Sequence, residues 1–313
     1  MIVVFGSINL DLIFPLPAIP RAGETLLAPG IRIEPGGKGA NQAVAAARDG
    51  AQVVMVGAVG RDALAAGALA LLRAADIDLT RVIEADAATG CAAIFVDPQG
   101  ANAIGVGSGA NLAARASQVE DPLLGPTTTL VLQTEVLPAE SAALIHRARA
   151  RGARVILNLA PAAPMETAAL RALDLLTVNE TEAAWLGNHL GCGTDAAALH
   201  GALGVDVVRT LGEDGADVAT IAGVQRLPAR RITPVDTTAA GDCFVGVLAA
   251  ALDRGAPLAA ALTRASTAAA LCCTRAGSQS SLPTSTDIDA LFASALLSRP
   301  RRCCDASEAS ALR

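Results

Sequence analysis

The sequence predicts an α/β fold: a three-layer αβα sandwich with a mostly parallel central sheet and a small β-sheet lid. Short apolar runs rich in β-branched residues alternate with Ala- and Leu-rich stretches of helical length along the 313 residues. Nearly continuous apolar strands with helices between them are typical of a parallel sheet covered on both faces. Two stretches rich in Pro and Gly, residues 12–35 and 90–106, lack a helical pattern and predict the lid.

The central sheet and its helices follow from this alternation. The expected strands are Ile2–Phe5, Val53–Val56, Leu130–Gln133, Val155–Leu157, Leu175–Val178 and Val205–Arg209. The expected helices are Ala40–Arg48, Ala63–Ala74, Ala139–Ala150, Glu180–Leu186, Ala196–Leu203, Ala240–Leu252, Leu258–Cys273 and Ile288–Leu297. Ligands of such sheets bind beyond the carboxyl ends of the strands, so polar residues there are candidates for a site.

The lid is expected to contain extended pieces at Thr25–Ala28 and Ile31–Glu34, and strands Cys91–Val96 and Ala101–Val106 joined by the turn at 97–100. We therefore divide the chain into a main domain (1–11, 36–89 and 107–298), a lid (12–35 and 90–106) and a tail (299–313). The lid strands alternate apolar and polar residues, and one small sheet would leave an apolar face uncovered. We therefore expect a homodimer formed through the lid.

Composition excludes several classes of protein. Hydrophobic residues make up 52% and charged residues 17%, which is not the composition of a disordered chain. A net charge of −6 argues against a nucleic-acid partner. No stretch reads as a membrane span, and the start of the chain lacks a basic segment before its apolar run, so we expect a cytoplasmic protein without a membrane partner. The seven cysteines are odd in number and follow no ligand spacing, and three histidines make a His-rich metal site improbable.

The first candidate motif is the glycine-rich run at residues 36–41, GGKGAN, which directly precedes a predicted helix. Glycines at a helix start let the backbone approach a ligand closely, and the free amides there attract polar or anionic groups. The run is not a phosphate-binding loop of the Walker A type, because Lys38 is followed by Gly39 rather than by Ser or Thr. A second glycine cluster, at 105–109, lacks the dinucleotide-binding spacing, which argues against an NAD-dependent oxidoreductase.

The second motif is VDTTAAGDCF at residues 235–244, which opens another predicted helix. Its small residues leave several amides free, and the helix dipole adds partial positive charge, so the motif suits an anion cradle for a transferring phosphoryl group. Asp242 lies in the first turn, where its carboxylate can accept a hydroxyl proton. The alternative is that Asp242 only completes the helix N-terminus.

Two further motifs follow predicted strands. Residues 179–182, NETE, are either an N-cap closed by a capping box or a water-mediated Mg²⁺ site. Residues 210–215, TLGEDG, are either a glycine turn against which an adenine nucleotide lies or a plain loop.

Taken in order, GSINLD at 6–11, GGKGANQA at 36–43, NETE, TLG and DTTAAGD resemble the PfkB (ribokinase-like) family of carbohydrate kinases, from Val3 to about Pro283. The resemblance implies a ribokinase-like fold and an ATP-dependent sugar kinase that phosphorylates the primary 5-hydroxyl of D-ribose to give ribose 5-phosphate and ADP. AGET at 22–25 and the run at 94–111 favour the ribose kinases of this family over its fructokinases and adenosine kinases. The alternatives are another kinase of the family, acting on a nucleoside, fructose or another sugar, and a non-catalytic sugar-binding protein.

The resemblance also implies roles for individual residues. Asp242 is the expected catalytic base, with an anion hole made of the amides of Ala239, Ala240 and Gly241. The residues expected to hold the sugar, together with Asp242, are Asn9, Asp11, Gly37, Lys38, Asn41 and Glu135. Those expected at the nucleotide are Asn179, Thr210, Gly212 and Gly215, with Glu182 organising Mg²⁺ through water. An activating K⁺ is expected at the Asp236 carboxylate and at the carbonyls of Thr238, Cys272, Gly277 and Ser281.

Overall fold

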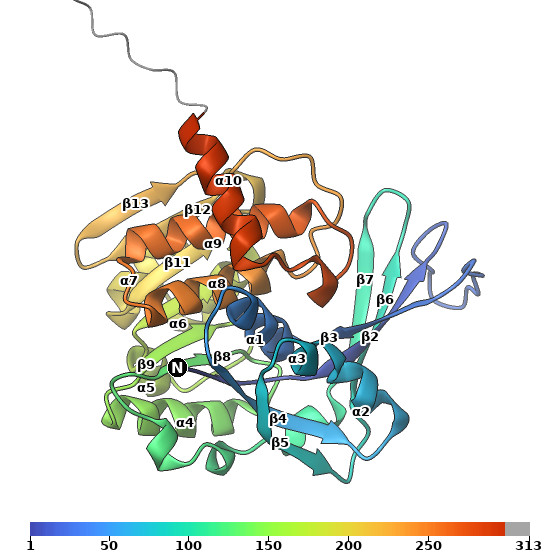
Figure 1. Ribbon diagram of the computed structural model, residues 1–313, viewed down its shortest axis with the longest axis horizontal. Coiled ribbons are helices and arrows are strands. Elements are labelled where there is room, and N and C mark those ends of the chain that lie inside the picture. Colours follow the sequence, from blue (N-terminus) through green and yellow to red (C-terminus); the bar gives the residue numbers. More distant parts are fainter. Residues whose placement is uncertain (298–313) are drawn as a thin grey trace, which may run out of the picture.

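The computed structural model of the protein describes residues 1–297, and these form two β-sheets with helices around the larger one (Figure 1). The larger sheet has nine strands in the order β13-β12-β11-β10-β9-β8-β1-β4-β5. Their bounds are β1 Ile2–Phe5, β4 Val53–Gly60, β5 Asp78–Ala85, β8 Thr129–Leu132, β9 Arg154–Asn158, β10 Leu175–Val178, β11 Asp206–Thr210, β12 Ala216–Thr220 and β13 Gly223–Leu227. The strands from β11 to β5 in this order pair in parallel, whereas β12 is antiparallel to both β11 and β13, so β12 and β13 form a hairpin at one edge. The predicted α/β class with a mostly parallel sheet is confirmed.

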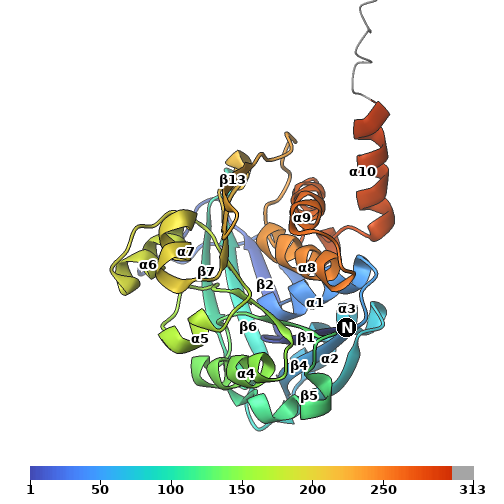
Figure 2. The same ribbon diagram turned by 90° about the vertical axis from the view of Figure 1, so that its left-hand side faces the viewer.

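Helices cover both faces of this sheet, as Figure 2 shows. One layer consists of α1 Lys38–Arg48, α2 Ala63–Ala68, α3 Ala70–Ala74, α8 Ala240–Asp253, α9 Leu258–Cys273 and α10 Ser285–Leu297. The other consists of α4 Pro138–Ala150, α5 Thr167–Arg171, α6 Glu180–Leu190 and α7 Ala196–Leu203. Short 3₁₀ turns lie at Gly109–Ala113, Ala116–Gln118, Asp121–Leu123, Gly212–Asp214 and Gln279–Ser281. Alternate residues of β1 point into the two layers: Ile2 and Val4 join one apolar core, Val3 and Phe5 the other.

The smaller sheet has four strands in the order β3-β2-β6-β7, with bounds β2 Asn9–Pro15, β3 Arg32–Gly36, β6 Gly90–Val96 and β7 Asn102–Gly107. It extends from the main body beside α1 and α2 (Figure 1). Its central pair, β2 and β6, is parallel, and the outer strands are antiparallel to their neighbours. Several large apolar side chains on this sheet are exposed, among them Ile33, Ile104 and Val106.

Some elements differ from the expectation. The strand β5 and the hairpin β12–β13 were not expected from the sequence, because their partly exposed positions carry polar residues among the apolar ones. Residues 25–28, expected to be extended in the lid, form no strand, and the single helix expected at 63–74 is divided at Leu69 into α2 and α3. The expected tail, 299–313, lies outside the described residues. Within residues 1–297, no helix has both the length and the apolar character needed to cross a bilayer.

Candidate active site

The start of α1 requires glycine for steric reasons. Gly37 has a φ of +89°, and a Cβ atom there would lie 2.8 Å from the amide nitrogen of Asn9. A Cβ on Gly39 would lie 2.6 Å from the amide nitrogen of Ser7. The helix can therefore begin directly against the segment that joins β1 to β2 only because both positions lack side chains. This close approach sets Lys38 and Asn41 beside the start of β2.

The start of α8 faces the same region. Ala239, directly before the helix, has a left-handed conformation with a φ of +60°, which is uncommon and strained for alanine. Asp242 follows in the first turn and is buried, with 7% of its surface exposed. One turn on, Gly246 allows α8 to cross α1 closely, because a Cβ atom there would collide with the carbonyl oxygen of Gln42. The crossing turns Asp242 toward α1.

The Asp242 carboxylate is held by α1 rather than by its own helix. Its Oδ2 accepts a hydrogen bond from Asn41 Nδ2 at 2.9 Å, and its Oδ1 accepts one from Gln42 Nε2 at 2.9 Å. The start of α8 has no side-chain cap hydrogen bond among the described residues. The geometry therefore favours a poised carboxylate over a simple helix-capping residue.

Four carboxylates lie within electrostatic reach of the Lys38 ammonium. Burial alone would lower the pKa of Lys38, but the attraction of the surrounding acids more than offsets it, and the pKa is raised. These acids are, in order of their influence, Asp242, Glu135, Glu182 and Asp11. The predicted sugar residues, the predicted base and the predicted Mg²⁺ ligand thus share one electrostatic environment around Lys38.

Asp11 is the most perturbed acid of this group. Burial raises its pKa from 3.8 to about 7, and the negative charges of Glu135, Glu34 and Asp242 add to the shift. Lys38 opposes it only in part. A buried carboxyl group whose pKa is raised toward neutral pH by burial and by neighbouring acids is typical of a functional site.

Three hydrogen bonds join residues of the expected sugar-binding set to neighbouring groups. Glu135 Oε2 accepts hydrogen bonds from Ser7 Oγ at 2.5 Å and from the Lys38 amide at 3.1 Å. Asn9 Oδ1 accepts one from Asn111 Nδ2 at 2.7 Å. Ser7 and Asn111 were not predicted as site residues. Asn111 lies in a 3₁₀ turn after the small sheet. It ends the run at 94–111 that resembles the ribose kinases, and this resemblance was the signal that could have identified it.

The residues expected at a monovalent cation also meet. Asp236 accepts hydrogen bonds from the Thr238 amide at 2.9 Å and from the Gly277 amide at 3.0 Å. Burial alone would raise the pKa of Asp236, but these bonds together lower it, so the group is charged at neutral pH. Cys272 Sγ lies 3.0 Å from Ser281 Oγ and 3.7 Å from the Thr238 carbonyl oxygen.

The small sheet contacts residues 277–281, the expected cation loop, through a residue that was not predicted. Glu34 of β3 accepts a hydrogen bond from the Ser278 amide at 3.0 Å. Its position across the small sheet is directly opposite Asp11 of β2. Ser278 of the same loop donates a hydrogen bond from Oγ to Asn41 Oδ1 at 3.4 Å, and Asn41 in turn donates to Asp242.

The start of α6 is closed by its own side chains. The Glu182 amide donates to Asn179 Oδ1, and the Asn179 amide donates to Glu182 Oε2, each at 2.8 Å. The capping box is therefore present. Burial raises the pKa of Glu182, which remains within electrostatic reach of Lys38 and Asp242.

The remaining predicted residues lie at the neighbouring strand end. Thr210 ends β11 and donates to the Val178 carbonyl at 3.4 Å. Gly212 and Gly215 both have positive φ, and a Cβ on Gly215 would collide with the Leu227 carbonyl, so this glycine has a packing reason of its own. Of the three predicted anion-hole amides, that of Ala240 already donates to the Thr237 carbonyl at 3.2 Å.

Among residues 1–297, no cluster of three or more His, Cys, Asp or Glu side chains could hold a metal ion. Mg²⁺ does not require one, since it keeps several waters and binds through one or two carboxylates together with substrate phosphates. Buried Glu182, which keeps a free carboxylate oxygen beside its capping bond, fits that mode of binding.

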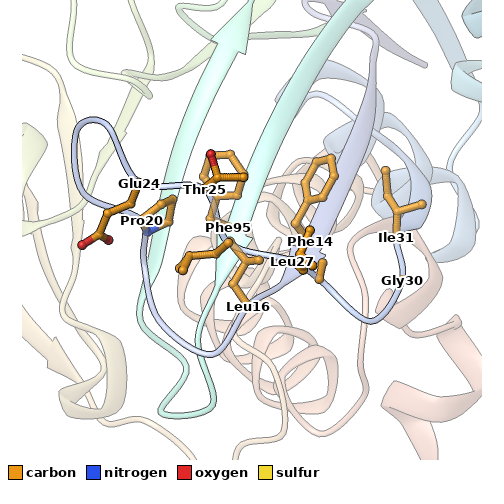
Figure 3. Close-up of a pocket in the computed structure, with 11 residues that line it drawn as sticks. Phe14, Leu16, Pro20, Glu24, Thr25, Leu27, Gly30, Ile31 and Phe95 are labelled. Carbon is orange, nitrogen blue, oxygen red and sulfur yellow. The ribbon is translucent and has the colours of Figure 1, made fainter.

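A separate, apolar cleft of about 520 Å³ lies in the lid (Figure 3). Phe14 and Phe95, whose ring centroids are 5.6 Å apart, lie on one side of it, and Leu16, Leu27 and Ile31 contribute further apolar surface. Leu27 is 87% exposed. The groups around Asp242 are polar, so this apolar cleft suits a different kind of ligand.

Comparison with known proteins gives consistent matches over the chain. A family model described as pfkB family carbohydrate kinase matches residues 1–285. The ribokinase of Haemophilus influenzae is 34% identical over 289 residues, which cover 90% of this chain and 94% of that protein. The deoxyribokinase of Salmonella typhimurium is 34% identical over 293 residues, covering 90% and 95%. A solved structure of Arabidopsis thaliana ribokinase complexed with ribose and ATP is 28% identical, with a TM-score of 0.83, covering 93% of this chain and 98% of that one.

Proposed function

This chain belongs to the pfkB family of carbohydrate kinases, and on that premise we propose that it transfers the γ-phosphate of ATP to the 5-hydroxyl of D-ribose, giving ribose 5-phosphate and ADP. The chain is a phosphotransferase with an alcohol group as acceptor. The observation that carries the assignment of the base is the buried Asp242 carboxylate, held by two amide side chains at the start of α8.

We propose that Asp242 takes the proton of the sugar hydroxyl as that oxygen attacks the γ-phosphorus. The proton moves to the carboxylate, the new O–P bond forms, and the bond to the β-phosphate oxygen breaks to release ADP. Amides at the start of α8 are proposed to stabilise the charge that develops on the phosphoryl oxygens: those of Ala239 and Gly241 directly, and that of Ala240 once its bond to the Thr237 carbonyl is broken. Phosphoryl transfer depends mainly on such positioning and electrostatic stabilisation.

The sugar-binding set is proposed to act through paired hydrogen bonds to adjacent hydroxyls. Carboxylate and amide side chains suit a polyol, because each can accept or donate two hydrogen bonds. The proposed residues are Asn9, Asp11, Gly37, Lys38, Asn41 and Glu135. Five of them lie on the two segments that the glycines of the α1 start bring together, which supports the assignment.

The nucleotide is proposed to lie along the carboxyl ends of β10 and β11, against Asn179, Thr210, Gly212 and Gly215. Glu182 would hold Mg²⁺ through water, and the ion would neutralise phosphate charge. The raised pKa of Glu182 supports this proposal, because a nearby cation would favour the ionised form that burial disfavours.

K⁺ is proposed to bind at Asp236 together with the carbonyls of Thr238, Cys272, Gly277 and Ser281. The oxygen-rich donor set suits a hard monovalent cation, and Asp236 adjoins the segment that leads into the α8 start. Replacing K⁺ by tetramethylammonium is expected to lower kcat in the native protein and to leave Asp236→Asn unaffected. An equal K⁺ response in both proteins would contradict the site.

The small sheet is proposed to act as the lid, and the protein is proposed to be a cytoplasmic homodimer that pairs through it. The exposed apolar side chains and the cleft in Figure 3 support pairing, because monomers rarely expose large contiguous apolar patches. Light scattering is expected to give twice the chain mass, and Leu27→Lys the single mass. A monomeric mass of the native protein at working concentration would contradict the dimer.

The function is tested by ADP release from Mg·ATP with D-ribose, 2-deoxyribose, fructose and adenosine. Fast turnover with D-ribose is the expected result. Preferred turnover with 2-deoxyribose would identify 2-deoxyribose as the acceptor and leave the proposed site residues unchanged. Preferred turnover with fructose or adenosine would identify a different kinase of the family. Absence of ADP with every acceptor would favour the sugar-binding alternative.

A further inference from the structure

A set of buried amide side chains lies behind the proposed base, outside the sugar-binding set. Gln42 and Gln133 are completely buried, and Asn158 is 9% exposed. Gln42 follows Asn41 on α1, Gln133 follows the end of β8, and Asn158 ends β9. Side chains from a helix and two neighbouring strand ends therefore converge on the inner side of Asp242.

The hydrogen bonds within this set have defined directions. Gln42 Nε2 donates to Asp242 Oδ1 at 2.9 Å and to Asn158 Oδ1 at 3.0 Å. Gln42 Oε1 accepts from Gln133 Nε2 at 2.6 Å. Asn158 Nδ2 donates in turn to the Thr177 carbonyl at 3.3 Å, so a backbone group of β10 fixes the Asn158 orientation.

These partners allow only one orientation of the Gln42 amide. Turned over, its oxygen would face the acceptors of Asp242 and Asn158, and its NH₂ group would face the NH₂ group of Gln133. Buried polar groups that lose their partners cost free energy, so the reversed orientation is strongly disfavoured. Gln133 contributes this bond through Nε2, while its own Oε1 is buried and has no hydrogen-bond partner within residues 1–297.

Asn41 and Gln42 differ in what they can do for the base. Both donate to the Asp242 carboxylate, but Asn41 also belongs to the proposed sugar-binding set and contacts Ser278 of the cation loop. Gln42 has no exposed surface, and all three of its described side-chain bonds are to buried residues. Its bond to Oδ1 can therefore persist while Asn41 changes partner on sugar binding.

We propose that Gln42 is a positioning residue of the phosphotransfer reaction: it fixes the Asp242 carboxylate in the orientation that accepts the hydroxyl proton, and Gln133 and Asn158 fix Gln42. The inference rests on Asp242 being the base. Gln42 touches neither substrate in this account and acts only through Asp242.

The first test is Gln42→Met, which keeps the length of the side chain and removes its hydrogen bonds. A misplaced catalytic group can cost about a hundredfold in rate, so kcat with D-ribose is expected to fall by about ten- to a hundredfold. KM for D-ribose and for Mg·ATP should stay within about twofold of the native values, since binding groups are untouched. Gln133→Met, which leaves the Gln42–Asp242 bond in place but frees the Gln42 amide, is expected to show a smaller loss of kcat with the same KM values.

The second test separates positioning from general structural damage. Effects that pass through a single group are not additive, so Gln42→Met should cause no further loss of the residual rate in an Asp242→Ala background. Thermal melts on the same proteins report folding. If Gln42→Met does not fold, the Gln133→Met and Asp242→Ala pair provides the same cycle.

Three results would overturn the proposal: native kcat in Gln42→Met and Gln133→Met, a loss expressed mainly in KM, or an equal rate loss in the Asp242→Ala background. Native kcat in Gln42→Met together with an inactive Asp242→Ala variant would show that Gln42 does not position the base, while Asp242 would still be the base. Native kcat in Asp242→Ala removes the base and the positioning role together.

Discussion

The starts of α1 and α8 differ from the start of α6. Helices α1 and α8 begin at residues with positive φ, Gly37 and Ala239. The first amides of α1, at Lys38 and Gly39, donate to the side chains of Glu135 and Ser7, whereas no side chain caps α8 among the described residues. Helix α6 has Asn179 as its N-cap, and both hydrogen bonds of its capping box are formed. An uncapped start leaves first-turn amides for a ligand, whereas a capped one satisfies them internally. The comparison indicates that α8 has an open start suited to an anionic ligand, whereas the first amides of α1 and α6 are bonded within the protein itself.

The largest effect is expected at the open start of α8. Asp242→Ala should lower kcat by about 10²- to 10⁴-fold, the usual contribution of a general base. Alanine is a cleaner probe than asparagine, because Asn41 and Gln42 both donate to this side chain and an asparagine NH₂ group would face one of them.

Asp253→Ala, at the other end of the same helix, is the matched control. It removes hydrogen bonds from the Met1 amino group, so it should lower thermal stability and leave kcat unchanged. Equal kcat values for Asp242→Ala and Asp253→Ala would contradict a catalytic role specific to the start of α8.

The close approach of the α1 start to the segment between β1 and β2 can be tested by replacing two glycines, one at a time, with alanine. Gly37 and Gly50 share a φ of +89°, but a Cβ atom would meet the Asn9 amide at 2.8 Å in the first case and nothing within 4 Å in the second. Each alanine variant should lose about 1–2 kcal/mol of unfolding free energy from the left-handed conformation. Gly37→Ala should in addition lower kcat/KM for the sugar by about a hundredfold, because it displaces the helix start.

Denaturant unfolding and sugar kinetics on both variants measure these effects. Native kcat/KM in Gly37→Ala would show that the close approach of the α1 start to Asn9 is not needed for sugar binding. A hundredfold loss of kcat/KM in Gly50→Ala would show that backbone strain alone explains the loss in Gly37→Ala.

Asp11, which is within electrostatic reach of Lys38 on α1 and Asp242 on α8, should lower the stability of the protein without bound sugar. The pKa of Asp11 is raised from 3.8 to about 7, chiefly by burial, so between these values the native state holds a proton that the unfolded chain releases. Its contribution to stability therefore falls as pH rises through that window. Without sugar, Asp11→Asn should be more stable than the native protein by up to about 2–4 kcal/mol at pH 8, and the difference should vanish near pH 4.

Urea unfolding at the two pH values measures the difference. A constant difference at both values, or a less stable variant at pH 8, would contradict the raised pKa. The same substitution is expected to raise KM for D-ribose, which separates its effect on binding from its effect on stability.

The smallest effect is expected at the closed start of α6. Asn179→Ala should lower the unfolding free energy by about 1 kcal/mol, as loss of an N-cap does. Asp195→Ala, which removes the N-cap of α7, is the control and should cost a similar amount. If Asn179 and Glu182 also organise Mg²⁺, only Asn179→Ala should raise KM for Mg·ATP, by severalfold. Identical kinetics in the two variants would reduce NETE to a capping box.

Most of the fold could be predicted from local pattern. The buried strands are nearly continuous apolar runs, and β1 and β10 begin and end where the sequence indicates. Strands with exposed positions could not be recognised in this way: β5 and β13 lie at the edges of the sheet and carry polar residues along much of their length. The parallel pairing of β2 with β6 joins segments about 80 residues apart, and no local signal encodes such a register.

The residues of the proposed site could be named from the sequence, whereas the side chains that support them were not. The comparisons confirm the family that the five motifs indicated. Gln133 and Asn158, which hold Gln42, were overlooked because each reads as the end of an apolar strand. A useful signal was available, since an amide at the carboxyl end of a buried parallel strand lies where ligands bind. Glu34 gave no such signal, because its contact with Ser278 depends on how the two sheets pack.

The most direct test of the account is the proton-coupled ³¹P spectrum of the product formed from D-ribose and Mg·ATP. Transfer to the 5-hydroxyl attaches phosphorus to an oxygen on a carbon with two protons, so the account predicts a triplet for the new ester beside the resonances of ADP. A doublet would place the phosphate on a carbon with one proton and contradict the proposed acceptor. Inorganic phosphate alone would contradict transfer to the sugar.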